Sequence, residues 1–333
     1  MDHPGLGSLH RDAALRRRMT APLGDSVAVP AAPSGWFAYG YALLLNGDLA
    51  LVRTERDIHA EYANVRREGS GEGAEDPRLS REDWRVRLST FDGTSESEAI
   101  EVSSGLWPQI DRLPDGRWVV VASRAEPGEK NARMFGADGM PAGEFALSDG
   151  IQDVRCALDG TIWTGYLDEG VDASPDADGG SPVSTAGLAQ FGIDGRLLWN
   201  FNAENRAGIH VDGSAALTVD GHRVWCCPHF QYPIVRIENG SVDYWQNDIL
   251  QSRALAVEGD CVLLASDYVE GEKHRLVLVR LLGDRSERLG DLQFPMPPQG
   301  AGLVQGRGAE LHVVAQGRWT RISVAAVRAA LNL

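Results

Sequence analysis

The chain has 333 residues, of which 43% are hydrophobic, so it has enough apolar surface to bury a sizeable core. Its formal net charge of −15 argues against nucleic acid as a partner, because phosphate binding needs a basic surface. No apolar run approaches about 18 residues, and the first residues lack the apolar segment of a signal peptide. We therefore expect a cytoplasmic protein with no membrane partner.

The chain opens with an arm, residues 1–24, which precedes a repeated unit. The unit is clearest in residues 107–147, where turns separate four short, strand-like apolar runs. Two of these turns, Asp115-Gly116 and Asp138-Gly139, have the dipeptide that is typical of tight hairpins, because such turns need positive φ. The unit therefore indicates a small antiparallel sheet of four strands.

Two columns of such turns recur along the chain. The column between the inner two strands of each unit comprises Asn46-Gly47, Asp115-Gly116, Asp159-Gly160, Asp220-Gly221, Glu258-Gly259 and Arg307-Gly308. The column between the outer two strands comprises Asp92-Gly93, Asp138-Gly139, Asp194-Gly195, Asn239-Gly240 and Gly283-Asp284. Where no loop is inserted, each column advances by roughly 38–50 residues, the length of a four-stranded propeller blade.

Five complete units and a sixth with only its first turn predict an all-β fold, a six-bladed β-propeller. The outer strand missing from the sixth unit is predicted to come from residues 25–30, which would close the ring and leave no free sheet edge. Short terminal helices are expected, one in the arm that Ser8 would cap and one at Ser323–Leu333. The chain is thus expected to divide into the arm at 1–24 and one propeller domain at 25–333.

Two insertions, residues 55–83 and 168–185, fall between second and third strands. Loops of this class lie on one face of a propeller, so both insertions are expected to overhang the same mouth of the central channel as a lid. In the second insertion, Ser174 begins a run with the spacing of a calcium loop, but Thr185 stands at the twelfth position, where that loop needs a Glu. We predict no metal site and no cofactor.

The four cysteines, Cys156, Cys226, Cys227 and Cys261, lie in predicted strands. The side chains of two consecutive strand residues point to opposite faces, so a disulfide between Cys226 and Cys227 would be strained. No CxxC spacing suggests zinc. We expect four free and mostly buried thiols.

Alternate residues of each innermost strand are expected to face the central channel. Six residues before the inner turn stand Gly40, Gln109, Asp153, Ser214, Ser252 and Ala301. Four residues before it stand Ala42, Asp111, Arg155, Ala216, Ala254 and Leu303. These side chains are small or polar, as a narrow, wet channel requires.

The polar side chains near the channel predict a ligand pocket at its mouth. Histidine beside a carboxylate makes an acid–base pair near neutral pH, which gives the candidate catalytic residues Asp153, His229, Asp111, His210 and Asp212. The candidate ligand-binding residues are Gln109, Arg124, Tyr166, Tyr232, Arg253, Asp267 and Tyr268. The alternative is that these groups pair with one another and with ordered water, as expected for Asp111 and Arg155 at equal depth on neighbouring blades.

The Asp-Gly-punctuated repeat over about residues 36–324 resembles six-bladed propellers outside the WD-repeat class, namely the gluconolactonase/regucalcin-like, strictosidine-synthase-like and NHL-type proteins. The run from Val224-Trp225-Cys226 to Val235-Arg236-Ile237 is similar to that of uncharacterised actinobacterial propellers. The resemblance implies a divalent metal held by acidic and amide side chains at the funnel mouth. Here Ala38 and Gly40 stand where an acidic ligand is expected, whereas Asp153 and Asp212 remain available.

The leading functional hypothesis is a small-molecule site at the funnel mouth under the two insertions. If the site is catalytic, its Asp, His and Tyr side chains favour acid–base chemistry of a hydrolase, lyase or cyclase over redox chemistry. The competing hypothesis is a non-catalytic scaffold that binds a partner protein on the propeller rim. Exposed tryptophans outside the channel, at positions 36, 84, 245 and 319, would favour the scaffold.

Overall fold

The structure of the protein is a computed structural model. It describes residues 16–17, 23–61, 63, 83–105, 107–172, 181–204, 209–229, 231–269, 272–298 and 302–333. In these residues no helix is long and apolar enough to cross a membrane.

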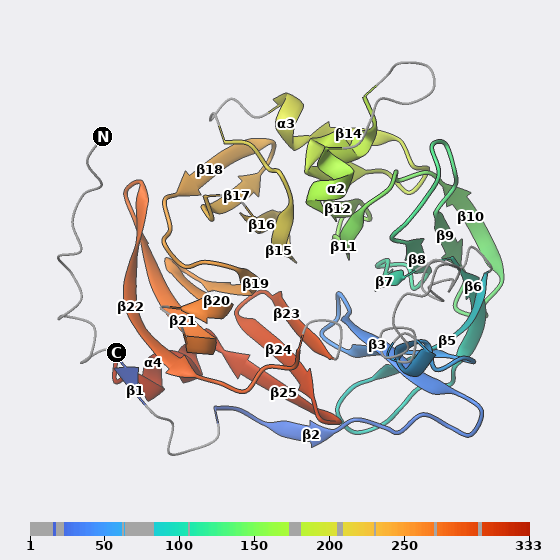
Figure 1. The fold of residues 1–333 in the computed structure, drawn as a ribbon, viewed down its shortest axis with the longest axis horizontal. Helices are drawn as coiled ribbons and strands as arrows, with labels where there is room; N and C mark the ends of the chain where they lie inside the picture. Colours follow the sequence, from blue (N-terminus) through green and yellow to red (C-terminus); the bar gives the residue numbers. More distant parts are fainter. Residues whose placement is uncertain are drawn as a thin grey trace.

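Six antiparallel sheets stand around a common centre, so the fold is a six-bladed β-propeller, as the turn columns predict (Figure 1). From the centre outward, blade 1 contains β3 (Phe37–Leu43), β4 (Leu49–Thr54), β5 (Trp84–Phe91) and β6 (Ile100–Ser104). Blade 2 contains β7 (Pro108–Arg112), β8 (Trp118–Ala122), β9 (Ala132–Phe135) and β10 (Pro141–Phe145). Blade 3 contains β11 (Ile151–Cys156), β12 (Ile162–Tyr166), β13 (Leu188–Phe191) and β14 (Leu197–Asn200). Blade 4 contains β15 (Ser214–Asp220), β16 (Arg223–Pro228), β17 (Ile234–Glu238) and β18 (Ser241–Trp245), and blade 5 contains β19 (Ser252–Glu258), β20 (Cys261–Val269), β21 (Glu272–Leu282) and β22 (Arg285–Gln293).

Blade 6 is completed by the beginning of the chain. Its inner strands are β23 (Leu303–Arg307), β24 (Glu310–Ala315) and β25 (Arg318–Ser323), and its outer strand is β2 (Ser26–Ala28). The strand β2 pairs antiparallel with β25, which confirms the predicted ring closure. A two-residue strand, β1 (Arg16–Arg17), also pairs with β22 at the edge of blade 5.

The glycine of every turn in both predicted columns has positive φ. These turns place the first-to-second and third-to-fourth strand connections of each blade on one face of the ring, here called the lower face. The loops between second and third strands, and those between blades, lie on the opposite, upper face.

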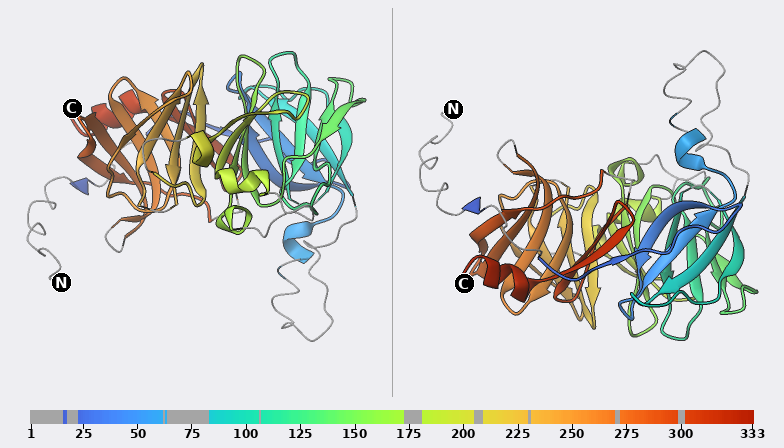
Figure 2. Two further views of the ribbon diagram at one scale, coloured as in Figure 1. Left: turned by 90° about the horizontal axis from the view of Figure 1, so that it is seen from above. Right: turned by 90° about the horizontal axis from the view of Figure 1, so that it is seen from below.

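Both insertions leave the ring on its upper face. The helical residues 58–61 and α2 (Asp168–Val171) project on the same side in both views of Figure 2. The 3₁₀ helix η3 (Val183–Ala186) ends the second insertion. The remaining residues of the two insertions, with the calcium-like run, lie outside the described residues, as does most of the arm at 1–24.

Two further helices lie at the periphery. One turn, α3 (Phe201–Glu204), leads from blade 3 toward blade 4. The predicted terminal helix is present as α4 (Val324–Ala330), and the hydroxyl of Ser323 caps it by accepting a hydrogen bond from the Ala326 amide at 3.0 Å.

The core is divided among the interfaces between blades. In β8, Trp118 and Val120 pack against blade 1, whereas Val119 and Val121 pack toward blade 3. Because neighbouring blades cover both faces of β8, the second strand of blade 2, its sequence is a continuous apolar run. All four cysteines are buried free thiols, as expected.

A β-bulge recurs near the upper end of four inner strands. The register shifts between Ala38 and Gly40 in blade 1, and between Ile151 and Asp153 in blade 3. It also shifts between Ser214 and Ala216 in blade 4, and between Ser252 and Ala254 in blade 5. A bulge re-aims the residues on either side of it, so strict alternation does not hold at the mouth of the channel.

Candidate functional site

The lower part of the channel is organised around Asp111 on β7, which is only 1% exposed. Its carboxylate accepts hydrogen bonds of 2.7 Å from the backbone amides of Arg112 and Cys156. The guanidinium of Arg307 on β23 is a third donor, at 3.2 Å. Burial raises the pKa of the Asp111 carboxyl, against the opposing effects of Arg307 and the two amides.

These contacts join both neighbouring and non-neighbouring blades of the ring. Asp111 links blade 2 to blade 3 through Cys156 and to blade 6 through Arg307. The hydroxyl of Thr218 in blade 4 donates a 2.7 Å hydrogen bond to the Gly306 carbonyl in blade 6. The lower end of the channel is therefore crossed by hydrogen bonds between blades.

The ion pair expected between Asp111 and Arg155 is replaced by two others. Asp111 pairs with Arg307, and Arg155 pairs with Asp153 two residues away on its own strand, at 2.6 Å. Arg155 still affects the electrostatics of Asp111, because its charge lowers the pKa of that carboxyl. The expectation compared neighbouring blades only, and Arg307 comes from a blade two positions away around the ring.

Asp153 stands above this network, at the bulge of β11. One carboxylate oxygen, Oδ1, accepts the hydrogen bond from Arg155, and the side chain remains 16% exposed. Burial raises the pKa of the Asp153 carboxyl, and Arg155 acts in the opposite direction.

Gly165 on β12 lets blade 4 approach Asp153 closely. A Cβ on Gly165 would lie 2.9 Å from the Ser214 hydroxyl oxygen and 3.7 Å from the Asp153 Cβ. The Ser214 hydroxyl is buried and has no hydrogen-bond partner in the part of the chain that the structure describes. Asp153 and the unused hydroxyl of Ser214 thus both lie beside Gly165, where blades 3 and 4 meet.

His229 lies at the same junction. Its backbone amide donates to the Gly213 carbonyl at 2.8 Å, and its exposed ring contacts Tyr232 edge-on at a centroid distance of 6.3 Å. Gly213 in turn packs near the Asp168 amide of α2. Within the described ranges, no hydrogen bond or ion pair joins His229 directly to Asp153.

A second polar group lies on blade 5. Arg253, the bulge residue of β19, donates to the Asp267 carboxylate at 3.2 Å and to the Pro297 carbonyl at 2.8 Å. His274 Nδ1 lies 3.5 Å from the same Asp267 oxygen. Arg253 and Asp267, predicted separately as ligand contacts, therefore form a pair.

Arg124 connects the upper loop of blade 2 to the second insertion. Its guanidinium pairs with Glu169 on α2 and lies 3.5 Å from Asp149. Arg124 therefore bridges the second insertion and the loop that contains Asp149.

The other predicted residues divide by exposure. Gln109 is half-buried on β7 and donates to Ser123 at 3.3 Å, His210 is exposed, and Asp212 is half-buried. Tyr166 is fully buried, and its hydroxyl donates to the Leu147 carbonyl at 2.7 Å. Tyr166 and Asp111 thus have their polar atoms engaged inside the ring, and we leave both out of the site. The side chain of Tyr268 lies outside the described residues.

The described residues contain no group of three or more His, Cys, Asp or Glu side chains placed to hold a metal ion. Asp153, one of the two acidic side chains that the resemblance leaves available for a metal, is instead paired with Arg155.

Sequence reasoning missed two sets of polar residues. Arg307 was read only as a turn residue, although its place at the end of an inner strand could have marked it as channel-facing. The second set lines a cleft between blades 3 and 4 on the lower face, around Trp163 and Trp199. Trp163 lies on β12 and Trp199 on β14, with β13 between them, and tryptophans in strands are also typical of an ordinary core.

No protein-family model matches the chain, and no curated protein matches its sequence. Among solved structures, it is similar to a gluconolactonase from Xanthomonas campestris, with 12% identity, 91% of this chain and 99% of the other covered, and a TM-score of 0.43. The propeller domain of a trilobed protease from Pyrococcus furiosus has 10% identity, 85% and 80% coverage, and a TM-score of 0.43. The extracellular domain of a one-component system from B. thetaiotaomicron has 8% identity and a TM-score of 0.45; 91% of this chain is covered, but only 42% of that one.

These similarities concern the fold only, and they give no information about the site. The chain is a six-bladed β-propeller with an N-terminal closing strand, and its polar channel is crossed by hydrogen bonds below and carries Asp153 at its upper mouth.

Proposed function

We propose that this propeller binds a small polar molecule at the upper mouth of its channel, where blades 3 and 4 meet. The observation that carries the proposal is the pair of Asp153 and Ser214: a carboxylate with one oxygen bonded to Arg155, beside a buried hydroxyl without a partner in the described residues. Buried polar groups are normally hydrogen-bonded, so unused hydrogen-bonding capacity at the mouth favours a polar ligand.

For the chemistry, we propose acid–base catalysis, with hydrolysis as the first candidate. Burial raises the pKa of the Asp153 carboxyl, and a raised pKa makes a carboxylate a stronger base near neutral pH. His229, exposed at the same junction, is the second candidate group. We place this activity in the cytoplasm, because the four buried thiols are unpaired, as is usual in a reducing compartment.

The binding proposal is tested with a set of small polar compounds and ligand-observed NMR. Asp153→Asn should weaken the compounds that bind wild type by tenfold or more, which corresponds to about 1.4 kcal/mol. Asp243→Asn is the matched control, since it also removes a carboxylate that pairs with an arginine at 2.6 Å, but on the outer strand of blade 4. That control should bind the compounds as wild type does.

Hydrolysis is tested with an activated ester, p-nitrophenyl acetate, and with a δ-lactone. If the two residues share the acid–base work, Asp153→Asn and His229→Ala should each lower the rate by about 10²–10⁴ without changing the fold. A loss of several kcal/mol of stability in Asp153→Asn would instead make Asp153 a structural residue.

Full activity and stability in both variants would reject the mouth site and favour the rim scaffold. Exposed tryptophans on the rim would favour a scaffold, but Trp84 and Trp319 are buried. Trp36 and Trp245 are half-buried, and arginine side chains lie over their rings.

A further inference from the structure

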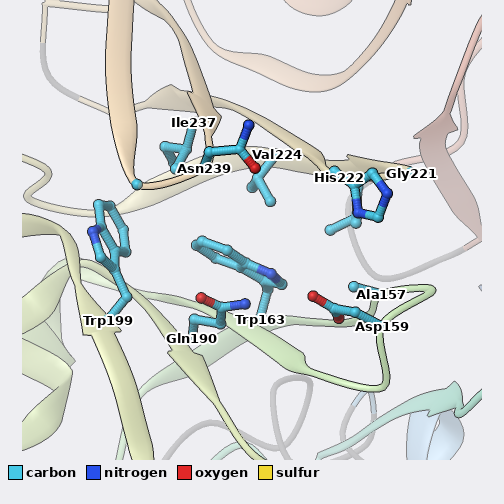
Figure 3. A pocket seen from close by; sticks show the side chains of 12 residues that line it. Ala157, Asp159, Trp163, Gln190, Trp199, Gly221, His222, Val224, Ile237 and Asn239 are labelled. Atoms are coloured by element: carbon cyan, nitrogen blue, oxygen red, sulfur yellow. The ribbon is translucent and has the colours of Figure 1, made fainter.

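A cleft of about 130 Å³ lies between blades 3 and 4 on the lower face, away from the mouth (Figure 3). Trp163 and Trp199 form its blade 3 wall, with ring centroids 5.6 Å apart and an interplanar angle of 52°. At the other end, Asp159 and His222 approach from opposite sides, one from the inner turn of each blade. The cleft therefore combines indole surfaces with a carboxylate.

The volume limits what the cleft accepts. Sites for whole small-molecule ligands are usually about 300–1,000 Å³. A cavity of about 150 Å³ holds a single benzene-sized group. The cleft is thus suited to one planar group, such as the end of one side chain.

The same chain shows what such an indole pair accepts. In blade 4, Trp225 and Trp245 stack with centroids 5.9 Å apart. The guanidinium of Arg236 lies over both rings, at 5.7 and 5.6 Å from the centroids, and pairs with Asp243 at 2.6 Å. An arginine between a tryptophan pair and a carboxylate is a favourable cation–π arrangement.

The strand register places Trp163 in the position that Trp225 has in blade 4, whereas Trp199 pairs with Gln190 and Trp245 pairs with Ile234. Arg236 is the cross-strand partner of Trp225, and Gln190 is the cross-strand partner of Trp163. Gln190 is uncharged, and its side-chain amide donates to the Thr161 hydroxyl at 2.9 Å. Blade 3 therefore has the aromatic pair without an arginine of its own.

The carboxylate for a cation is supplied by Asp159. Its Oδ1 accepts hydrogen bonds from the Thr161 amide at 2.9 Å and hydroxyl at 2.7 Å, which orient the group. In the described part of the chain no arginine or lysine pairs with Asp159, and no arginine lies over Trp163 or Trp199. A cationic partner also matches the net charge of −15.

We propose that this cleft binds the guanidinium of an arginine side chain on a partner polypeptide, stacked on Trp163 and Trp199 and paired with Asp159. The site is separate from the proposed function at the mouth, and neither depends on the other.

The test follows the indole N–H signals of the full chain by NMR, with the Trp199 signal assigned from Trp199→Phe. The probe is a blocked pentapeptide with one arginine between glycines, and its neutral twin carries citrulline in place of arginine. For contacts through one side chain, we expect a dissociation constant on the order of 1 mM, and at least about tenfold weaker binding of the citrulline peptide.

Asp159→Asn removes the charge but keeps the oxygen that caps the turn, and should weaken the arginine peptide by about fivefold or more. Asp138→Asn is the matched control: it is an Asp-Gly turn residue in blade 2 that accepts from the Met140 amide at 3.1 Å, and it should change nothing. Free arginine should bind no more tightly than the peptide.

Three results would overturn the proposal. One is unchanged indole signals with the arginine peptide at about 20 mM, well above the expected dissociation constant. Another is equal binding of the citrulline peptide, which would indicate a neutral occupant. The third is a clear preference for free arginine, which would make the cleft a small-molecule site.

Discussion

The indole Nε1 of Trp319 donates a hydrogen bond of 3.1 Å to Nδ1 of His312, inside blade 6. The contact fixes the imidazole as a neutral ring with its proton on Nε2. His312 is 3% exposed, and burial lowers its pKa from 6.5 to about 3, with further lowering by the positive charges of Arg321 and Arg307. Glu310 lies 3.6 Å from Nε2.

We predict that His312 destabilises the fold in acid. Below pH 6.5 the unfolded chain takes up a proton at this residue and the folded protein does not, so its contribution to stability is complete above pH 6.5 and is lost as the pH falls toward about 3. The slope approaches about 1.4 kcal/mol per pH unit within that window. It is measured as the pH dependence of the free energy of unfolding.

The buried carboxyls of Asp111 and Asp153 have raised pKa values and therefore contribute the opposite slope. For this reason the comparison is between wild type and His312→Asn, which should lose part of its acid sensitivity. His222→Gln, on the exposed inner turn of blade 4, should keep the slope of wild type. Equal slopes in all three proteins would contradict the assignment.

Asp111→Asn should destabilise the protein by about 3–5 kcal/mol, because it leaves the buried Arg307 without its counter-charge. Chemical unfolding in urea measures this loss. Replacing Arg307 by Leu in the Asp111→Asn background should recover part of it. Asp243→Asn, which breaks a more exposed pair with Arg236, should cost less than about 1 kcal/mol. Similar losses of unfolding free energy in Asp111→Asn and Asp243→Asn would mean that the buried Asp111–Arg307 pair contributes no more to stability than the exposed pair.

Gly24→Ala should strongly impair the ring closure. The residue has φ of +152°, and an added Cβ would lie 1.9 Å from the Arg321 carbonyl oxygen of β25. Gly35→Ala is the control, because its φ of +81° is also strained but no atom lies within 4 Å of the added Cβ. We expect a melting temperature a few degrees lower for Gly24→Ala than for the control, since about 1 kcal/mol shifts it by roughly 2–4 °C in proteins of about 150–250 residues and by less in a longer chain. Matching temperatures would show that the segment shifts without cost.

Gly170→Ala should loosen α2 from the ring. An added Cβ would lie 2.8 Å from the Asp149 carbonyl oxygen and 3.2 Å from the Gly150 Cα, both backbone atoms of the facing loop. Overpacking of this kind costs about 1–3 kcal/mol, and faster proteolysis within the second insertion is the readout. Gly40→Ala, with no atom within 4 Å of its Cβ, should be neutral. Unchanged cleavage in Gly170→Ala would show that α2 is not held through this contact.

The ring could be predicted from sequence because the turns that separate its strands are determined by local sequence. Each Asp-Gly or Asn-Gly turn depends on two adjacent residues, and their spacing gave the number of blades. The closing strand was also predictable, since the sixth unit lacked an outer strand and residues 25–30 were the apolar segment left over.

The channel was less predictable because its contacts are long-range. Asp111 and Arg307 are 196 residues apart, and the local sequence around each residue does not indicate that they pair. The bulges beside Asp153 and Arg253 shift the strand register by one residue, so alternation counted from the turn fails at the mouth. The cleft around Trp163 was hidden for a different reason, because a buried tryptophan in a strand is usually core.

The closing strand also constrains how the protein is made. Thr320 and Ser26, whose hydroxyls lie 3.2 Å apart, are separated by 294 residues, so β2 must wait for almost all of the remaining ring to be synthesised. Until then β25 has no outer partner, and Val27 cannot cover the side of Trp319. A ribosome that stalls anywhere before blade 6 leaves β2 unpaired and the apolar faces of the two end blades uncovered, and such surfaces invite aggregation. Pairing of β2 with β25 is thus the step that protects a newly made chain from aggregation with other chains.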